Sequence, residues 1–97
     1  MSLRVQFSRR ADGDLTRIWR YTSERWGRPQ ADRYIGQIRD AVTTLMANPL
    51  AGDRSEVLGD GYRRYRVGSH VVFYRLAPDT IRVVRVLHIR MDFGQHL

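Results

Sequence analysis

The chain has 97 residues, which allows one hydrophobic core and therefore a single domain, residues 1–97. It has no cysteine, no N-terminal stretch typical of a signal peptide and no apolar run long enough to span a bilayer, so the expected setting is a reducing cytoplasm. All seventeen basic residues are arginine and they oppose ten acidic residues, which indicates either a biased genomic base composition or an anionic partner.

The first half of the chain predicts one short strand followed by two helices. Apolar and polar residues alternate over residues 3–7, and Ser8 is placed to cap a helix after them. Apolar residues then recur every three or four positions until Gly27, which suits a helix end. A second apolar stripe begins after Pro29 and stops at Asn48-Pro49. Two helices with so short a connection must form an antiparallel hairpin.

The second half predicts a loop over residues 50–61 and then a meander of three strands. The strands cover residues 62–67, 70–76 and 81–89. Gly68-Ser69 and Pro78-Asp79 supply the turns between them, and the third strand is apolar enough to be interior. The order β-α-α-β-β-β predicts an α+β fold in which the helical hairpin packs on one face of a small antiparallel sheet.

Alternation along the third strand predicts which residues share a face. We expect Arg82, Val84, Val86, His88 and Arg90 to point away from the helices, with Arg85 and the other odd-numbered residues toward them. A charge inside an apolar strand must reach solvent, find a carboxylate or face a partner. Both tryptophans lie on the stripe of the first helix, so we expect them in the core.

Two side-chain groups suggest chemistry. The run Tyr62-Arg63-Arg64-Tyr65-Arg66 suits binding of phosphates and bases, or else an edge strand protected by charge. His88 and Arg90 share a strand face and would suit a ribonuclease as general acid–base and anion stabiliser, with His96 or Tyr65 as third group. The alternative is a buried, hydrogen-bonded His88. The sequence has no metal-ligand spacing and no glycine-rich phosphate loop, and it predicts no metal and no cofactor.

The whole chain resembles the ParE toxins of the wider RelE/ParE superfamily. The resemblance rests on Gly61-Tyr62-Arg63, on residues 66–75 and 85–92, and on the closing His96-Leu97. In the first half the matching positions are Ala11, Asp14, Leu15, Ile18, Tyr21, Arg25-Trp26-Gly27, Ala31, Tyr34, Asn48-Pro49 and Gly52.

This resemblance implies a bacterial toxin of a type II toxin–antitoxin system that inhibits DNA gyrase. It also implies a ParD-like antitoxin with a ribbon-helix-helix DNA-binding part and a segment that folds onto the toxin, in a hetero-oligomer expected to be a heterotetramer. Operator DNA would be bound only through the antitoxin.

RelE-type relatives instead cleave mRNA on the ribosome, and that activity is the alternative. A nuclease of this chain would use Arg63, His88, Arg90 and His96. Tyr65 and Val71 occupy positions where RelE would have lysine and arginine. A toxin without catalysis of its own therefore fits better. A plain nucleic-acid-binding module fits less well, because no recognition-helix pattern is present.

Two contact surfaces are expected. Residues after the last strand have little periodicity and are predicted to project as a mobile tail that binds the target. The target-binding residues would be Arg90, Met91, Asp92, Phe93 and His96. An acidic antitoxin segment would lie in an apolar groove beside the hairpin, and nearby arginines would steer its association. These antitoxin-binding arginines are Arg63, Arg66, Arg75 and Arg82.

Overall fold

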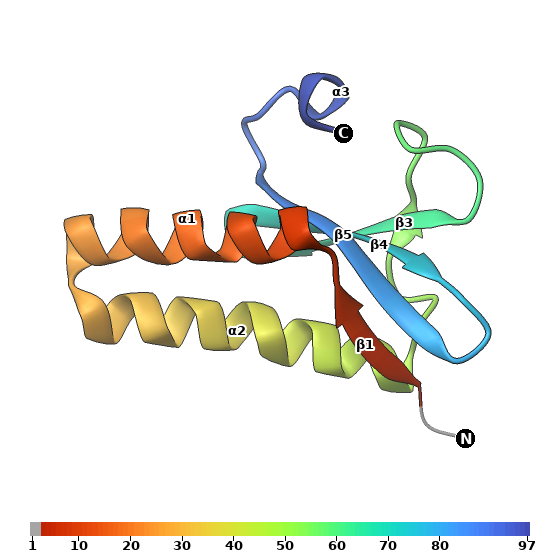
Figure 1. The fold of residues 1–97 in the computed structure, drawn as a ribbon, viewed down its shortest axis with the longest axis horizontal. Helices are drawn as coiled ribbons and strands as arrows, with labels where there is room; N and C mark the ends of the chain where they lie inside the picture. Colours follow the sequence, from red (N-terminus) through yellow and green to blue (C-terminus); the bar gives the residue numbers. More distant parts are fainter. Residues whose placement is uncertain (1–2) are drawn as a thin grey trace.

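In the computed structural model, which describes residues 3–97, a helical hairpin covers one face of a five-stranded sheet (Figure 1). The elements in chain order are β1 (Arg4–Phe7), α1 (Arg9–Trp26), α2 (Arg28–Ala47), β2 (Asp53–Arg54), β3 (Tyr62–Val67), β4 (His70–Leu76), β5 (Thr80–His88) and α3 (Phe93–His96). The α+β class and the hairpin on the sheet are as predicted. None of the helices within residues 3–97 is long and apolar enough to cross a membrane.

The strands lie in the order β1-β5-β4-β3-β2, so β5 is interior, as its apolar character predicts. The three strands of the meander pair antiparallel, whereas β1 pairs parallel with β5. The sheet is therefore mixed. The short β2 lies in the stretch that the sequence predicts as a loop, and it pairs antiparallel with β3.

The helices begin and end at the residues that the sequence predicts. The hydroxyl of Ser8 accepts the backbone N–H of Ala11 at 3.0 Å and donates to the carbonyl of Val84 at 2.8 Å, which joins the start of α1 to β5. Gly27 has a φ of +89° and separates the two helices by a single residue, a conformation that a residue with a side chain rarely adopts. Asn48 caps the end of α2.

The main core fills the space between the hairpin and the sheet. Tyr74 is fully buried there, and its hydroxyl donates to the Pro49 carbonyl at 2.8 Å and accepts the Gly52 N–H at 3.0 Å. The core consists of Ala11, Leu15, Ile18, Ile38, Val42, Leu45, Val72, Tyr74, Ile81, Val83 and Val86.

A register shift in β5 changes which side chains face the hairpin. Phe73 pairs with Arg85 but Tyr74 pairs with Val83, so Val84 is an extra residue in the ladder. Beyond it the alternation is inverted: Val86 packs in the core under the hairpin, and Leu87 packs on the other face. The predicted faces are therefore wrong for the second half of β5, because simple alternation assumes no bulge.

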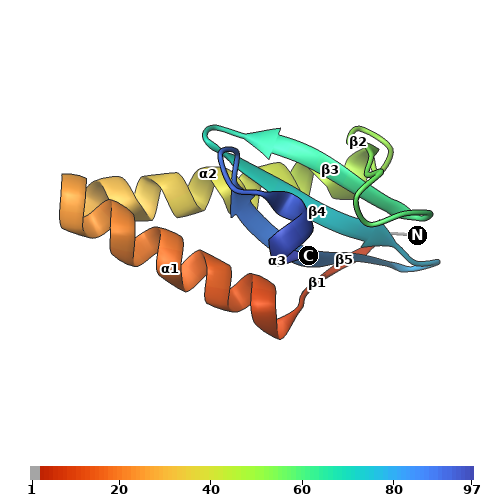
Figure 2. The ribbon, with the colours of Figure 1, turned by 90° about the horizontal axis from the view of Figure 1, so that it is seen from above.

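The other face of the sheet carries a second apolar cluster, covered by the C-terminal segment. Val71, Phe73 and Leu87 form it, and α3 lies over this part of β4 and β5 (Figure 2). The ring of Phe93 packs edge-on against Phe73 at 5.0 Å between centroids, and Leu97 packs on the same cluster. The segment is docked on the sheet, so the prediction of a projecting tail is wrong.

The two tryptophans behave differently. Trp19 is half-buried, and its indole N–H donates to Asp32 of α2 at 2.8 Å. Trp26, at the end of α1, is 63% exposed. The prediction of a core position is wrong for Trp26, because the hairpin extends beyond the edge of the sheet at that end (Figure 1).

Candidate functional site

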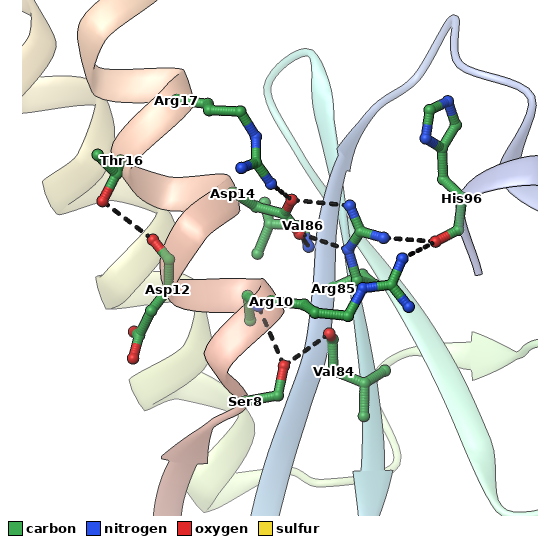
Figure 3. Close-up of polar contacts among 11 residues, drawn as sticks. Ser8, Arg10, Asp12, Asp14, Thr16, Arg17, Val84, Arg85, Val86 and His96 are labelled. Carbon is green, nitrogen blue, oxygen red and sulfur yellow. Dashed lines mark hydrogen bonds and ion pairs between the residues drawn. The ribbon is translucent and has the colours of Figure 1, made fainter.

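A buried carboxylate connects α1 to β5. Asp14 is 3% exposed and Arg85 is 7% exposed, and each lies in an otherwise apolar setting. Asp14 accepts Arg85 Nε at 2.8 Å and Nη2 at 2.9 Å, the backbone N–H of Val86 at 2.9 Å, and Arg17 Nη2 at 2.6 Å (Figure 3). Arg85 thus finds the carboxylate that a charge inside an apolar strand requires.

The pair is held in its charged form. Burial by itself would raise the pKa of Asp14, but the hydrogen bonds from Arg85, Val86 and Arg17 outweigh burial and hold this pKa below the usual 3.8. The hydrogen bond with Asp14 raises the pKa of Arg85 in turn. With four donors around it, the carboxylate has its acceptor sites occupied.

The same guanidinium reaches the C-terminal segment. Arg85 Nη1 donates to the backbone carbonyl of His96, and Arg10 Nη2 of α1 donates to the same oxygen at 2.8 Å (Figure 3). The last carbonyls of a helix have no intrahelical donor, and here two arginines donate to one of these carbonyls. Arg85 therefore contacts both α1 and α3 from its place in β5.

A groove runs along α1 and has a volume of about 780 Å³; we call it the α1 groove. Its rim is apolar and accessible: Tyr21 is 56% exposed, Trp26 63% and Met91 44%. The guanidinium of Arg25 lies over the rings of Tyr21 and Trp26, at 5.3 and 5.7 Å from their centroids. Large apolar side chains exposed beside a groove indicate a contact site for another molecule.

Two histidines in ring contact, His70 at the start of β4 and His88 at the end of β5, line the far wall of the α1 groove. The hydroxyl of Tyr34 accepts the Ser69 N–H at 3.1 Å and is hydrogen-bonded to His70 Nδ1 at 2.5 Å. Burial, together with the neighbouring His88, lowers the pKa of His70 from 6.5 to about 4. His70 is therefore neutral at pH 7.

His88 is hydrogen-bonded at the end of β5 and lies against His70. It is half-buried, its ring packs edge-on to that of His70 at 5.2 Å, and its Nδ1 accepts the Arg90 N–H at 3.1 Å. His88 and His96 both line the α1 groove, while Arg90 is exposed just beyond β5.

Arg63, the fourth residue of the nuclease set, lies elsewhere. Its Nη1 donates to the Gly52 carbonyl at 2.6 Å, in the β2–β3 region. Arg63 pairs with Tyr74 across the sheet, whereas His70 pairs with Val67, four residues further along β3 and about 13 Å away. The structure therefore does not bring the four residues into one site.

The other predicted antitoxin-binding arginines lie on the sheet. Arg66, Arg75 and Arg82 are exposed, and Arg75 of β4 is the direct cross-strand partner of Arg82 of β5. The Arg75 guanidinium lies over the ring of Tyr62, at 5.4 Å from its centroid. Like charges directly opposite each other repel, so this pair favours an anionic partner.

The predicted target-binding residues form one continuous segment at the end of β5. Arg90, Met91 and Asp92 are exposed, and Phe93 and His96 are half-buried in α3. Within residues 3–97 no group of three or more metal-binding side chains is arranged to hold a metal ion.

Sequence reasoning missed the central role of Asp14. Asp14 enters the sequence analysis only as a position that matches the ParE resemblance, yet it lies three residues after Ala11 and four before Ile18, on the buried stripe. A carboxylate on an apolar stripe predicts a buried partner, and Arg85 was the available arginine. The link from Tyr34 to His70 gives no such signal, because it depends on the packing of α2 against the β3–β4 turn.

Comparison with known proteins shows to which family the chain is similar. Residues 5–93 match the model of a family described as the ParE toxin of the type II toxin–antitoxin system parDE. The chain is 42% identical to toxin ParE1 of Mycobacterium tuberculosis over 98 aligned positions, covering all of both chains. It is 41% identical to toxin ParE1 of Caulobacter vibrioides over 92 positions, covering 95% of each chain.

Solved structures share the fold at lower identity. A chain of the chromosomal ParDE system of P. aeruginosa superposes with a TM-score of 0.79 at 22% identity, over 92% of this chain and 98% of that one. A chain of the RelBE2 toxin–antitoxin complex of M. tuberculosis superposes with a TM-score of 0.67 at 21% identity, over 91% and 99% of the two chains.

The chain shares its fold, a helical hairpin on a small mixed sheet, with these two chains. Its sequence matches place it in the RelE/ParE superfamily of toxins. Within that superfamily the full-length sequence similarity is to ParE proteins. The chain belongs to the ParE toxin family of type II toxin–antitoxin systems.

Proposed function

We propose that this toxin inhibits DNA gyrase by binding it, without catalysis of its own, and that a ParD-like antitoxin neutralises it in the bacterial cytoplasm. The part of the proposal that concerns the antitoxin, its partner half, rests on the α1 groove with its exposed aromatic rim. The full-length similarity to ParE1 toxins supports the class of activity. Operator DNA is then reached only through the antitoxin, in a complex that we expect to be a heterotetramer.

The dimensions of the α1 groove fit a helical segment. The groove follows α1 from Asp14 to Trp26, a span of about 18 Å at 1.5 Å per residue, which matches about three turns of a second helix. Recognition of an amphipathic helix in such a groove places its apolar side chains between Tyr21, Trp26 and Met91.

The charges around the α1 groove favour an acidic segment. Arg17, Arg85 and Asp14 line the groove and together carry a net charge of +1, and of the three only the Arg17 side chain is exposed. An acidic side chain of the partner therefore meets the exposed Arg17 guanidinium rather than a free carboxylate. The exposed arginines of the sheet, with Arg63 beside them, add long-range attraction that steers association.

Binding alone accounts for gyrase inhibition if the toxin favours one conformational state of the enzyme. The segment with Arg90, Met91, Asp92, Phe93 and His96 is the proposed contact with gyrase, because three of these side chains are exposed beside the docked α3. The nuclease alternative is less well supported, since Arg63 lies apart from His88 and His96.

Two assays with the purified chain test the proposal. We expect inhibition of gyrase supercoiling on relaxed plasmid, relief of that inhibition by the antitoxin encoded beside the toxin gene, and no site-specific cleavage of mRNA on ribosomes. Cleavage of mRNA with supercoiling unaffected would replace gyrase inhibition by the nuclease activity. Inhibition that the antitoxin does not relieve would refute the partner half.

A further inference from the structure

The C-terminal segment is fixed to the rest of the molecule by few contacts. On the apolar side, Phe93 and Leu97 pack on the Val71, Phe73 and Leu87 cluster. On the polar side, the His96 carbonyl receives Arg85 Nη1 and Arg10 Nη2. With only four helical residues, α3 is too short to be stable by itself, so these contacts decide its position.

Arg85 reaches His96 because Asp14 orients its guanidinium. Two of its nitrogens, Nε and Nη2, bind the two carboxylate oxygens of Asp14, and this two-point contact fixes the plane of the guanidinium. The third nitrogen, Nη1, is thereby directed to the His96 carbonyl on the opposite side (Figure 3). A lysine at this position has a single ammonium and lacks the fork that makes both contacts.

The bulge in β5 makes this arrangement possible. Because Val84 is an extra residue, Arg85 lies where the strand changes its facing pattern, between the hairpin side and the α3 side. Beside it β1 has ended, since β1 pairs with β5 only as far as Val83. Asp14 occupies that free edge and accepts the Val86 N–H.

We propose that Arg85, oriented by Asp14, is a positioning residue that fixes the C-terminal segment against the sheet, and that the toxin acts on its target only with the segment fixed. This inference rests on the proposed function for its second half, the contact of residues 90–96 with gyrase. Its first half, that Arg85 fixes the C-terminal segment, concerns the toxin alone and is measured without gyrase.

The experiment compares two folded variants of the full chain. Arg85→Lys keeps a cation beside Asp14 but loses the bond to His96, and the double variant Asp14→Leu/Arg85→Met replaces the pair with apolar side chains of similar size. The control is Arg20→Met, which removes an exposed arginine of α1. Cooperative thermal unfolding establishes that each variant is folded.

Release of Leu97 and His96 by carboxypeptidase, followed by mass spectrometry, reports whether the segment is fixed. We expect release about tenfold faster in both variants than in the wild type and the control, with gyrase inhibition weakened by a similar factor, for loss of a charge-assisted hydrogen bond. Arg10→Ala should give a smaller acceleration, because Arg85 still holds the carbonyl.

Wild-type release rates in the folded Arg85→Lys variant would overturn the proposal, as would faster release with undiminished inhibition. If the double variant does not fold, Arg85→Lys and Arg10→Ala decide the question. If the wild-type chain does not inhibit gyrase, the proposed function fails, and the release rates still decide whether Arg85 fixes the segment.

Discussion

Asp14 and Arg85, 71 positions apart in the chain, form a two-point ion pair that joins the helical hairpin to the sheet. Both side chains are buried, and the backbone N–H of Val86 binds the same carboxylate. A buried pair of this kind is not necessarily more stabilising than apolar residues of similar size, but loss of one member leaves the other charged and unpaired. The pair therefore makes the fold sensitive to either substitution alone.

The first prediction concerns this sensitivity. Asp14→Ala should lower the free energy of unfolding by about 3–5 kcal/mol, because it leaves the Arg85 guanidinium buried without a counter-charge. Asp14→Leu/Arg85→Met should recover most of that loss. Urea denaturation at pH 7 measures both. The exposed pair of Arg4 and Asp79 supplies the control, and Asp79→Ala should have little effect. A loss below about 1 kcal/mol for Asp14→Ala would contradict the argument.

The second prediction concerns pH. The pKa of His70 is about 4 in the folded chain and 6.5 in the unfolded chain, so the unfolded state binds more protons between these values. The free energy of unfolding should therefore fall as the pH drops from 6.5 to 4, by about 2 kcal/mol for this partly solvated ring. Asp14, whose pKa is lowered from 3.8, acts in the same direction at still lower pH.

His70→Gln tests the assignment, since a glutamine amide can still form a hydrogen bond with the Tyr34 hydroxyl but does not titrate. Urea denaturation at several pH values should give the variant a flatter profile between pH 6.5 and 4 than the wild type. An equally steep profile in the variant would assign the pH dependence to another group.

Local sequence signals were sufficient for the helical hairpin and the three-stranded meander, but not for the parallel pairing of β1 with β5 or for β2. The capping hydroxyl of Ser8, the positive φ available to Gly27 and the helix stop at Asn48-Pro49 act within a few residues, and all three have the expected role in the structure. The apolar periodicities between them then require the hairpin to cover the sheet.

The candidate site was less predictable, because its features depend on contacts between distant segments. The bulge at Val84 inverts the facing of Val86 and Leu87, and no residue type in β5 signals it. The exposure of Trp26 depends on how far the hairpin extends beyond the sheet. The docking of Phe93 depends on an apolar cluster that joins Val71 and Phe73 of β4 to Leu87, which the bulge turns to that face.

The third prediction locates the antitoxin on the α1 groove. Tyr21→Asp should weaken antitoxin binding about 100-fold, because it places a charge among the apolar contacts proposed for the rim of the groove. Tyr21 is 56% exposed, so folding should be unaffected. Leu50→Asp is the matched control, as Leu50 is 62% exposed and lies outside the groove. Isothermal titration calorimetry with purified antitoxin measures the difference, and equal affinities for the two variants would exclude the groove as the binding site.

The last prediction distinguishes the effect of the Arg75 and Arg82 charges on antitoxin association from the effect of the net charge of the chain. Arg75 and Arg82 are cross-strand partners on the exposed face of the sheet, so reversing both to glutamate removes a concentrated positive field. Antitoxin association should become several-fold slower at low salt, while dissociation changes little, because exposed charges act on the diffusional encounter of the two proteins more than on the final complex.

The control Arg33→Glu/Arg39→Glu changes the net charge equally but lies on α2, outside the α1 groove. Stopped-flow kinetics at about 50 and 500 mM salt measure both rates, and the difference between the two double variants should vanish at the higher concentration, where screening is strong. Association rates indifferent to salt and to both reversals would mean that the arginines of the sheet do not serve the antitoxin.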